Sequence, residues 1–447
     1  MKKTLIFFLL FGFIELAIAQ SSPPPFLQPI KVQPTPTPLV KKTGSVTPAN
    51  IPFSTNEALD VPSFVTEEIR FPGHTGILIE TQDGRVVKEQ NADVVFNPAS
   101  NVKVATAYVA LRWFGPEYRF PTFVFTDGKL DRENLRIEGN LYVMGRDPMF
   151  AFQHAVAIAE GLNQMGIREI TGDLIVTDRF SMNFVSSAQA SANFLLATLD
   201  ASRRSPQATQ AWIQHLRNSG RGNMLYVPSV FVAGKAHVSQ VPTNARLLLT
   251  HESVPLREII KFMMSFSHNW VAERLGDAVG GIYTITATVQ RDVGVLPQEF
   301  YIQSSSGLGI NRVTPRAMMK ILRTLQAELA RYRMTFADVM PVAGIDPGTL
   351  QNRFNDAYTV GSLVGKTGTL GNTDGGVSTL AGEIQTRNGG KMLFVIFNQR
   401  GSVASFRRLQ DAYLKAIQNE FGGAIPLGYS SMGMAQRLAR SNIYLNQ

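Results

Sequence analysis

Three short motifs in this chain of 447 residues constrain its fold most, because their side chains are chemically useful only if the chain brings them together. In chain order they are Ser100-Asn101-Val102-Lys103, Ser267-His268-Asn269 and Lys366-Thr367-Gly368, with the patterns S-x-x-K, S-x-N and K-T-G. Each is short enough to occur by chance, so one motif alone is weak evidence for a site. All three in this order indicate one serine acyl-transfer reaction, to which each can contribute a part.

Further copies of the second and third motifs occur, but their surroundings do not suit a site. Lys42-Thr43-Gly44 lies in a proline-rich stretch with no strand to hold it, and Ser54-Thr55-Asn56 precedes the nucleophile motif. Ser181-Met182-Asn183 and Ser191-Ala192-Asn193 border or enter a run of small and polar residues. We therefore exclude all four copies from the predicted site.

The periodicity around the first motif predicts a helix that begins near Ser100. At about 100° per residue, Ser100 and Lys103 fall together one turn apart, and apolar or small residues form a stripe on the other side. The stripe comprises Val102, Ala105, Thr106, Val109 and Trp113. A helix of this kind buries one face and presents a hydroxyl beside an amine.

Ser100 and Lys103 form the predicted nucleophile and base. A free serine is a poor nucleophile near neutral pH and needs a base beside it. Lys103 can serve if burial and positive neighbours lower its pKa towards neutrality, and Lys366 is a candidate for such a neighbour. The N-terminal end of the helix also favours negative charge that develops on Ser100. A solvated lysine on a helix surface is the structural alternative, and the other two motifs argue against it.

The second motif supplies polar groups between two helix-patterned stretches, residues 256–266 and 270–275. Ser267 suits a proton relay between Lys103 and a leaving amine. Asn269 can hydrogen-bond the amide of a substrate. An ordinary break between two helices is the structural alternative.

The third motif follows a short extended-looking stretch and therefore predicts a strand edge. Lys366 and Thr367 can hold a substrate carboxylate by charge and hydroxyl, and Gly368 permits close approach of the substrate. Thr369 can add a hydroxyl, and its backbone N–H can form an oxyanion hole with that of the serine nucleophile.

Other chemistries find little support, and we expect no metal or other cofactor. The histidines include no pair four residues apart and no H-E-x-x-H, which argues against a zinc site. No phosphate-binding or dinucleotide-binding glycine motif occurs. A Ser-His-Asp triad stays open on composition, although no G-x-S-x-G supports it.

The N-terminus predicts export. Lys2-Lys3, an apolar run over residues 5–17 and Ala17-Ile18-Ala19 have the pattern of a signal peptide over residues 1–19. A membrane anchor is the alternative, but the apolar run is short for a bilayer span and contains Glu15. Residues 20–55 are rich in proline and predict an extended linker. The chain has no cysteine, which excludes disulfides, a lipid anchor on cysteine and thiol catalysis. We therefore expect a bacterial protein of the periplasm or cell envelope.

The net charge of +9 and the pI of about 9.7 raise the question of nucleic-acid binding. The basic residues are scattered rather than clustered, and export argues further against a nucleic-acid partner. Weak peripheral attraction to an anionic envelope is the functional alternative. An ordinary solvated basic surface is the structural one.

Beyond residue 55 the chain predicts a mixed α+β protein with an inserted part. A hairpin is expected from strands at 76–80 and 86–88, and a discontinuous main domain from residues 56–119 and 251–447. Residues 120–250 predict a β-rich insertion, interrupted at 186–222 by a partly helical or mobile segment. The expected strands of the insertion are 122–125, 135–143, 173–176, 230–233 and 246–249. Thr314-Pro315 predicts the start of a helix. We also expect two strands at 378–385 and 391–398 and a closing helix at 406–421.

The chain resembles the class C low-molecular-mass penicillin-binding proteins, the D-alanyl-D-alanine carboxypeptidase/endopeptidase family. The resemblance rests on the three motifs and on further stretches over most of residues 56–421. These are Gly139-Asn140-Leu141-Tyr142-Val143, Gly145-Arg146-Asp147-Pro148, Ile170-Thr171-Gly172-Asp173-Leu174, Thr177-Asp178-Arg179-Phe180, Ser306-Gly307-Leu308, Asn311-Arg312-Val313-Thr314-Pro315, Pro341-Val342-Ala343-Gly344 and Thr379-Leu380-Ala381-Gly382. The long separation of Ser100 from Ser267 is similar to this family and unlike compact β-lactamases.

The resemblance implies a penicillin-recognising serine fold, an antiparallel five-stranded sheet flanked by helices with the site between sheet and helices. It implies cleavage of D-Ala-D-Ala termini or D-Ala cross-links in peptidoglycan through a Ser100 acyl-enzyme, and acylation by β-lactam antibiotics. His268 stands where the family usually has aspartate or asparagine, and Ser304-Ser305-Ser306-Gly307 replaces a usual Asp-Gly-Ser-Gly. A β-lactamase, or a catalytically silent binding module of the same fold, are the alternatives.

Overall fold

The computed structural model describes residues 69–223 and 226–446. The predicted signal peptide, the predicted linker and the motif copies at residues 42–44 and 54–56 lie outside this part. Within it, no helix combines the length and the apolar character needed to cross a membrane.

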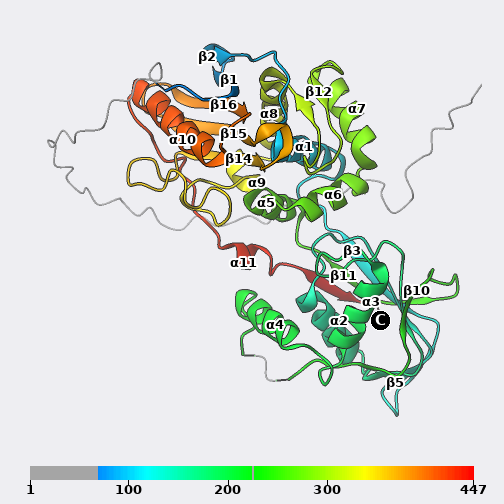
Figure 1. Cartoon of the computed structure of the whole chain (residues 1–447). Coiled ribbons are helices and arrows are strands. Elements are labelled where there is room, and N and C mark those ends of the chain that lie inside the picture. The colour runs from blue at the N-terminus through cyan, green and yellow to red at the C-terminus, as the bar shows by residue number, and fades with distance from the viewer. Residues whose placement is uncertain (1–68, 224–225, 447) are drawn as a thin grey trace, which may run out of the picture. The chain divides into compact units, whose positions relative to one another are not determined.

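The first sheet has five antiparallel strands in the order β14-β15-β16-β1-β2. Their bounds are β1 (His74–Thr81), β2 (Val86–Gln90), β14 (Leu363–Leu370), β15 (Val377–Thr386) and β16 (Gly390–Gln399). This confirms the predicted antiparallel sheet and the hairpin formed by its first two strands. The helix α10 (Val403–Glu420) covers one face, and α1 (Val102–Phe114) and α8 (Pro315–Ala330) lie on the other (Figure 1).

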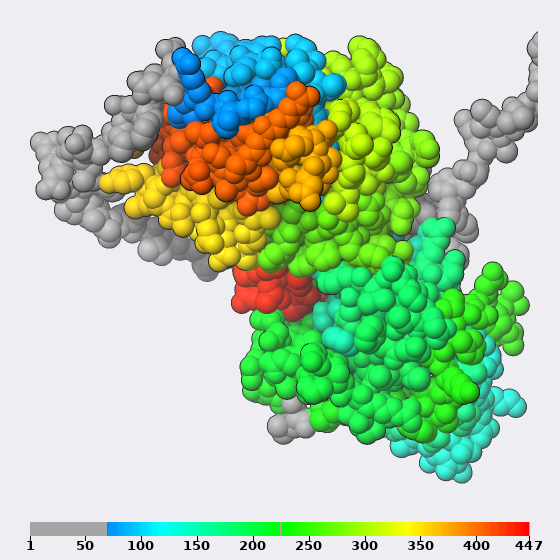
Figure 2. Space-filling model, in the orientation of Figure 1, coloured from blue at the N-terminus to red at the C-terminus, as the bar shows by residue number. Residues whose placement is uncertain are grey.

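Alternate residues of the strands point to opposite sides of this sheet. Both faces are buried because helices pack on each side. In β16, Phe394 and Ile396 join the core beneath α10, while Leu393 and Val395 join the core beneath α1 and α8. The surface of α10 borders that of the residues near 370, at the end of β14 (Figure 2). The sheet is therefore the central layer of a three-layer domain.

The helical side of the domain supplies the elements that carry the first two motifs. Besides α1 and α8 it contains α5 (Leu256–Phe266), α6 (Asn269–Ala278), α7 (Gly281–Val293) and α9 (Phe336–Val339). The predicted cap of α8 is confirmed, since the Thr314 hydroxyl accepts from Ala317 N–H at 3.0 Å.

The inserted part holds a six-stranded sheet in the order β10-β8-β6-β3-β11-β17 and a four-stranded sheet in the order β4-β5-β7-β9. Their bounds are β3 (Pro121–Thr126), β4 (Lys129–Asp131), β5 (Arg136–Glu138), β6 (Leu141–Gly145), β7 (Glu169–Ile170), β8 (Leu174–Val176), β9 (Phe231–Val232), β10 (Ala236–Val238), β11 (Arg246–Glu252) and β17 (Asn442–Leu445). The stretch 135–143, predicted as one strand, forms two that belong to different sheets.

Three helices pack in the inserted part: α2 (Phe152–Gln164), α3 (Ala188–Leu199) and α4 (Pro206–Asn218). The segment 186–222, predicted as partly helical or mobile, contains α3 and α4. Ser187 caps α3 and Ser205 caps α4, each accepting from a backbone N–H of the first turn. Sequence reasoning predicted no helix at α2.

The C-terminal end of the chain departs from the predicted division into domains. After α10 come α11 (Met434–Arg437) and β17, which pairs antiparallel with β11. Residues 442–445, expected in the main domain, are therefore the edge strand of the inserted sheet. The boundaries at 119/120 and 250/251 stay predictions.

Candidate active site

A single 3-10 turn, Ala99–Asn101, carries Ser100 into α1. Ala99 is buried and has φ 47°, a left-handed conformation that is uncommon for a residue with a side chain. The loop at Gly307 packs on this turn so closely that a Cβ there would lie 1.9 Å from the Ala99 carbonyl oxygen. Surrounding packing thus holds the start of α1 in a strained conformation, as is common at functional sites.

The Lys103 amine donates three hydrogen bonds within the site. Its Nζ donates to Ser100 Oγ at 2.9 Å, to Asn269 Oδ1 at 2.8 Å and to the Ser306 carbonyl at 2.6 Å. Lys103 has 0% exposure, and α1 is buried on all sides from Val102 to Leu111. The prediction of a helix with one buried stripe was therefore wrong, and the lysine is an interior one.

Burial gives Lys103 the properties of a base near neutral pH. Desolvation lowers the pKa of Lys103 to about 7, and the charge of Glu273 opposes this shift. Sequence reasoning had named burial and positive neighbours as causes of a lowered pKa, and burial is the principal cause. Near pH 7 a substantial fraction of this amine is neutral and can accept a proton.

The second motif forms the turn between α5 and α6. Ser267 ends α5 in a left-handed conformation, with φ 54°, and its Oγ accepts from Lys366 Nζ at 2.8 Å. His268 caps α6 through its Nδ1, which accepts from Val271 N–H at 3.4 Å. The turn thus aims the predicted relay serine at the third motif and Asn269 at Lys103.

The third motif lies on β14, next to the chain that enters Ser100. Lys366 has 0% exposure, and burial together with the charge of Lys103 holds its pKa well below the usual range. A Cβ on Gly368 would lie 2.1 Å from Thr379 Oγ1 and 2.8 Å from the Pro98 carbonyl oxygen. Glycine is required here by the close approach of two backbone segments.

The two threonines that follow Lys366 face different surroundings. Thr367 is buried and Thr369 is exposed. Thr369 Oγ1 accepts from Arg407 Nη2 on α10 at 2.7 Å. All three motifs therefore meet between the sheet and the helices, as predicted.

Sequence reasoning missed Glu273, which lies one turn after Asn269 on α6. Its carboxylate accepts from Ser306 N–H at 3.0 Å and from Ser305 N–H at 3.2 Å. It therefore fixes the loop whose Ser306 carbonyl accepts from Lys103. The spacing of four residues between Asn269 and Glu273, which places both on one face of a helix, was an available signal.

The excluded motif copies within the described part have structural roles. Ser191 lies buried in α3, where its Oγ accepts from Met182 N–H at 3.1 Å. Ser181 Oγ donates to the Val185 carbonyl at 3.0 Å. Both serve local turns of the inserted part.

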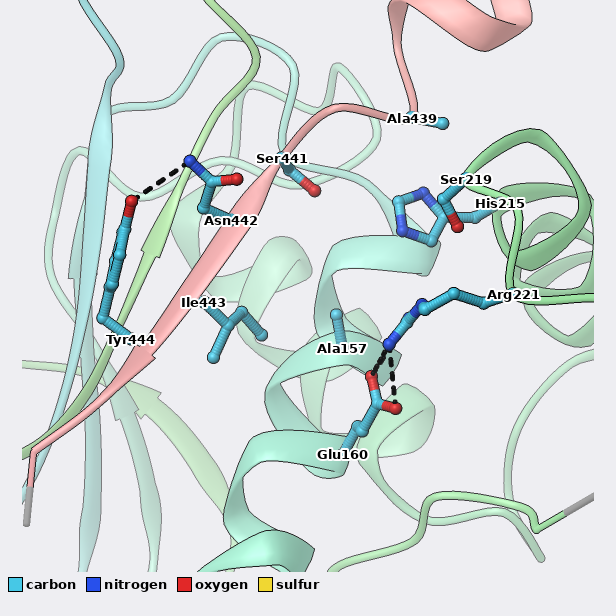
Figure 3. Close-up of a pocket in the computed structure, with 10 residues that line it drawn as sticks. All are labelled: Ala157, Glu160, His215, Ser219, Arg221, Ala439, Ser441, Asn442, Ile443 and Tyr444. Carbon is cyan, nitrogen blue, oxygen red and sulfur yellow. Dashed lines mark hydrogen bonds and ion pairs between the residues drawn. The ribbon is translucent and has the colours of Figure 1, made fainter. Parts of the chain in front are cut away.

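A separate pocket of about 460 Å³ lies in the inserted part and contains none of the motif residues (Figure 3). Arg221 and Glu160 form a bidentate ion pair in it. The other lining residues are Ala157, His215, Ser219, Ala439, Ser441, Asn442, Ile443 and Tyr444. Because its cation is already paired, the pocket presents no free charge to a ligand.

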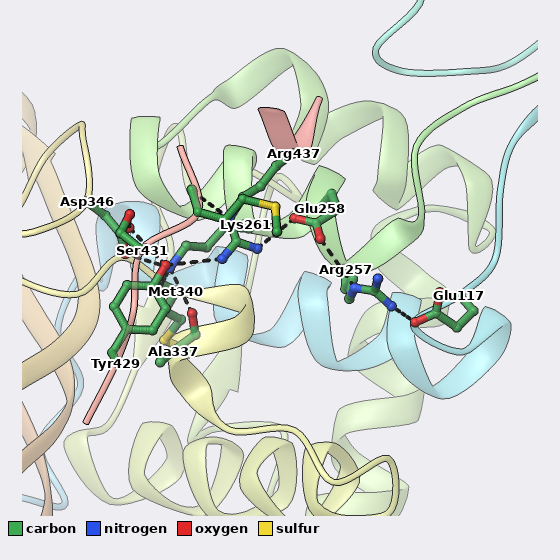
Figure 4. A network of polar contacts seen from close by, with 11 residues as sticks. Glu117, Arg257, Glu258, Lys261, Ala337, Met340, Asp346, Tyr429, Ser431 and Arg437 are labelled. Atoms are coloured by element: carbon green, nitrogen blue, oxygen red, sulfur yellow. Dashed lines mark hydrogen bonds and ion pairs between the residues drawn. The ribbon is translucent and has the colours of Figure 1, made fainter. Parts of the chain in front are cut away.

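A buried polar network stabilises α5, the helix that ends at Ser267 (Figure 4). Lys261 Nζ donates to Asp346 Oδ2 at 2.6 Å, and the Tyr429 hydroxyl donates to Asp346 Oδ1 at 3.0 Å. Arg437 Nη1 pairs with Glu258 at 2.8 Å. The C-terminal segment is thereby attached to the helix that positions the second motif.

Two curated relatives match most of this chain. D-alanyl-D-alanine carboxypeptidase DacB of Haemophilus influenzae is 24% identical over 458 residues, which cover 80% of this chain and 93% of the relative. A D-alanyl-D-alanine carboxypeptidase of an Actinomadura species is 25% identical over 460 residues, 80% of this chain and 83% of the relative.

A solved structure shows the same fold. It is a penicillin G-acylated predatory endopeptidase from Bdellovibrio bacteriovorus in complex with an immunity protein. The TM-score is 0.67 at 22% identity, and the match covers 80% of this chain and 95% of the other. The family match itself spans residues 66–190 and 222–418, more than half of the sequence, and the chain therefore belongs to the D-Ala-D-Ala carboxypeptidase 3 (S13) family.

Proposed function

We propose that this serine DD-peptidase cleaves D-Ala-D-Ala termini and D-Ala cross-links of peptidoglycan stem peptides through an acyl-enzyme on Ser100. The observation that carries the proposal is the interior Lys103 amine, 2.9 Å from Ser100 Oγ and with a pKa lowered to about 7. Acyl transfer needs a nucleophile in hydrogen-bond contact with a base, and a third group that orients the base. Asn269 and the Ser306 carbonyl orient the base here.

Acylation begins when neutral Lys103 accepts the proton of the Ser100 hydroxyl. The neutral amine keeps two N–H groups for Asn269 and the Ser306 carbonyl, so its lone pair faces Ser100. The Ser100 oxygen attacks the carbonyl carbon of the penultimate D-Ala, and the oxyanion is stabilised by the backbone N–H groups of Ser100 and Thr369.

Collapse of the tetrahedral intermediate breaks the peptide bond and requires a proton on the leaving amine. Ser267 delivers its hydroxyl proton, which the hydrogen bond from Lys366 makes more available. Ser267 then takes up the proton that Lys103 accepted from Ser100, so Lys103 becomes neutral again. Water then attacks the acyl-enzyme, with Lys103 again as the base, and releases the shortened peptide. A β-lactam acylates Ser100 in the same way, but its ring-opened amine stays attached.

Both carboxypeptidase and endopeptidase action fit this mechanism. The curated relatives are named carboxypeptidases, and the solved neighbour is named an endopeptidase acylated by penicillin G. The predicted signal peptide and the basic charge of +9 support export to the periplasm and peripheral association with an anionic envelope.

Fluorescent penicillin tests the proposal and separates it from its alternatives. The protein should retain the label for hours, and mass spectrometry should place the adduct on the peptide that contains Ser100. Rapid loss of the label would indicate a β-lactamase, and no labelling a silent module of the same fold. Undiminished labelling of Ser100→Ala would overturn the assignment of the nucleophile.

A further inference from the structure

Arg407 offers a cation beside the exposed end of the third motif. It lies one turn into α10, is exposed to solvent, and donates from Nη2 to Thr369 Oγ1 at 2.7 Å. The carboxylate one turn further along α10, that of Asp411, accepts from Arg353 Nε at 2.8 Å. Among residues 69–223 and 226–446, no salt bridge includes Arg407.

Lys366 is poorly suited to supply the positive charge that binds a substrate carboxylate. Its Nζ is buried and donates to Ser267 Oγ and to the Thr367 carbonyl. Burial and the charge of Lys103 also hold its pKa well below the usual range, which disfavours the charged form. An arginine, by contrast, keeps its charge and presents a planar fork that matches a carboxylate.

We propose that Arg407, together with the Thr369 hydroxyl, binds the α-carboxylate of the D-residue on the leaving side of the scissile bond. Because Thr369 Oγ1 already accepts from Arg407, its own proton is free to donate to that carboxylate. The proposal rests on the proposed function and assigns a specificity-determining residue to it. In this proposal Arg407, rather than Lys366, supplies the positive charge that selects substrates with a free terminal carboxylate.

A pair of soluble peptides tests this assignment. One is an N-acylated L-Lys-D-Ala-D-Ala with a free carboxylate, and the other is the same peptide with a C-terminal amide. The wild-type protein should prefer the acid in kcat/KM. Arg407→Ala should lower kcat/KM for the acid by about 10- to 100-fold, the size expected for a lost charge-assisted hydrogen bond, and leave that for the amide nearly unchanged.

Two further variants make the test specific. Arg408→Ala removes the neighbouring exposed arginine of the same helix and should keep the wild-type preference, whereas Arg407→Lys should restore part of the preference that Arg407→Ala loses. An unchanged acid-to-amide ratio in Arg407→Ala, or an equal loss on both peptides, would overturn the inference. If the wild-type protein cleaves neither peptide and takes no penicillin label, the proposed function fails instead.

Discussion

Acidification should destabilise this protein through three histidines in the inserted part. The rings of His154 on α2 and His251 on β11 lie 4.8 Å apart, and the ring of His215 on α4 lies 6.3 Å from that of His154. Both ring nitrogens of His251 are buried without a hydrogen-bond partner. Burial lowers the pKa of His251 to about 3 and that of His215 to about 4, and holds that of His154 well below its usual value.

The direction of the effect follows from linkage between protonation and folding. An unfolded histidine has a pKa of about 6.5, so below that pH the unfolded chain binds protons that the folded chain does not. Stability is therefore complete above about pH 6.5 and falls as the pH drops towards 4. At pH 5 each histidine that stays neutral in the folded state lowers the free energy of unfolding by about 2 kcal/mol. The upper limit for the three together is about 6 kcal/mol. That is a large share of the 5–15 kcal/mol by which domains are typically stable.

Thermal unfolding followed by circular dichroism between pH 7.5 and pH 5 measures this loss. His251→Phe replaces a ring that lacks polar partners by an apolar one that can keep the edge contact with Phe150, whose centroid lies 5.6 Å away. The fall in Tm on acidification should shrink by about a third, because one of the three groups no longer titrates. His237→Ala, which removes a half-exposed histidine outside the cluster, should behave as wild type. An identical fall in Tm for His251→Phe and wild type would refute the reasoning.

Three further outcomes follow from the site. The rate of acylation by penicillin should rise with pH through an apparent pKa of about 7, since only neutral Lys103 accepts a proton, and Lys103→Arg should lower the rate by at least about 10²-fold. Glu273→Gln removes a charge that stabilises the ammonium form, so the midpoint of the same pH–rate profile should move to lower pH; a shift to higher pH would contradict this. Gly368→Ala should slow acylation and lower the free energy of unfolding by about 1–3 kcal/mol, because its Cβ would meet Thr379 and Pro98. The control Gly371→Ala should leave the acylation rate unchanged, because its Cβ would meet nothing within 4 Å.

Several elements of the main domain could be predicted because their signals are local. The stretch 256–266 has a strong helical pattern, and α5 spans the same residues. Thr314 followed by proline marks the start of α8. The stretches 378–385 and 391–398, joined at Asn388-Gly389-Gly390, predicted β15 and β16 within two residues at each end. In each case a short run of residues contains the whole signal.

The parts that escaped prediction depend on distant partners. The strand β17 has four residues and is defined by its pairing with β11, almost two hundred residues earlier in the chain. The small and polar residues of 186–222 indicated a partly helical or mobile segment, and the packing that orders α4 lies elsewhere in the sequence, since Trp212 and Leu216 bury against Val156 and Ala157 of α2. Tertiary contacts of this kind override local propensity and leave little trace in the sequence nearby.

The same limit applies to the two lysines on which the proposed chemistry depends. Periodicity placed Lys103 on the polar side of its helix, because nothing within α1 shows that Asn269 and the Ser306 carbonyl supply acceptors there. Lys366 was interpreted as a substrate-binding cation on a strand edge, because nothing within β14 shows its buried contact with Ser267 Oγ in the turn after α5. Residue types and their order thus predicted which side chains come together, whereas the burial that lowers the pKa values of the two lysines arises only when sheet and helices close over them. The candidate nucleophile and base could therefore be named from the sequence, whereas the contact of the exposed Arg407 on α10 with Thr369 became visible only in the folded chain.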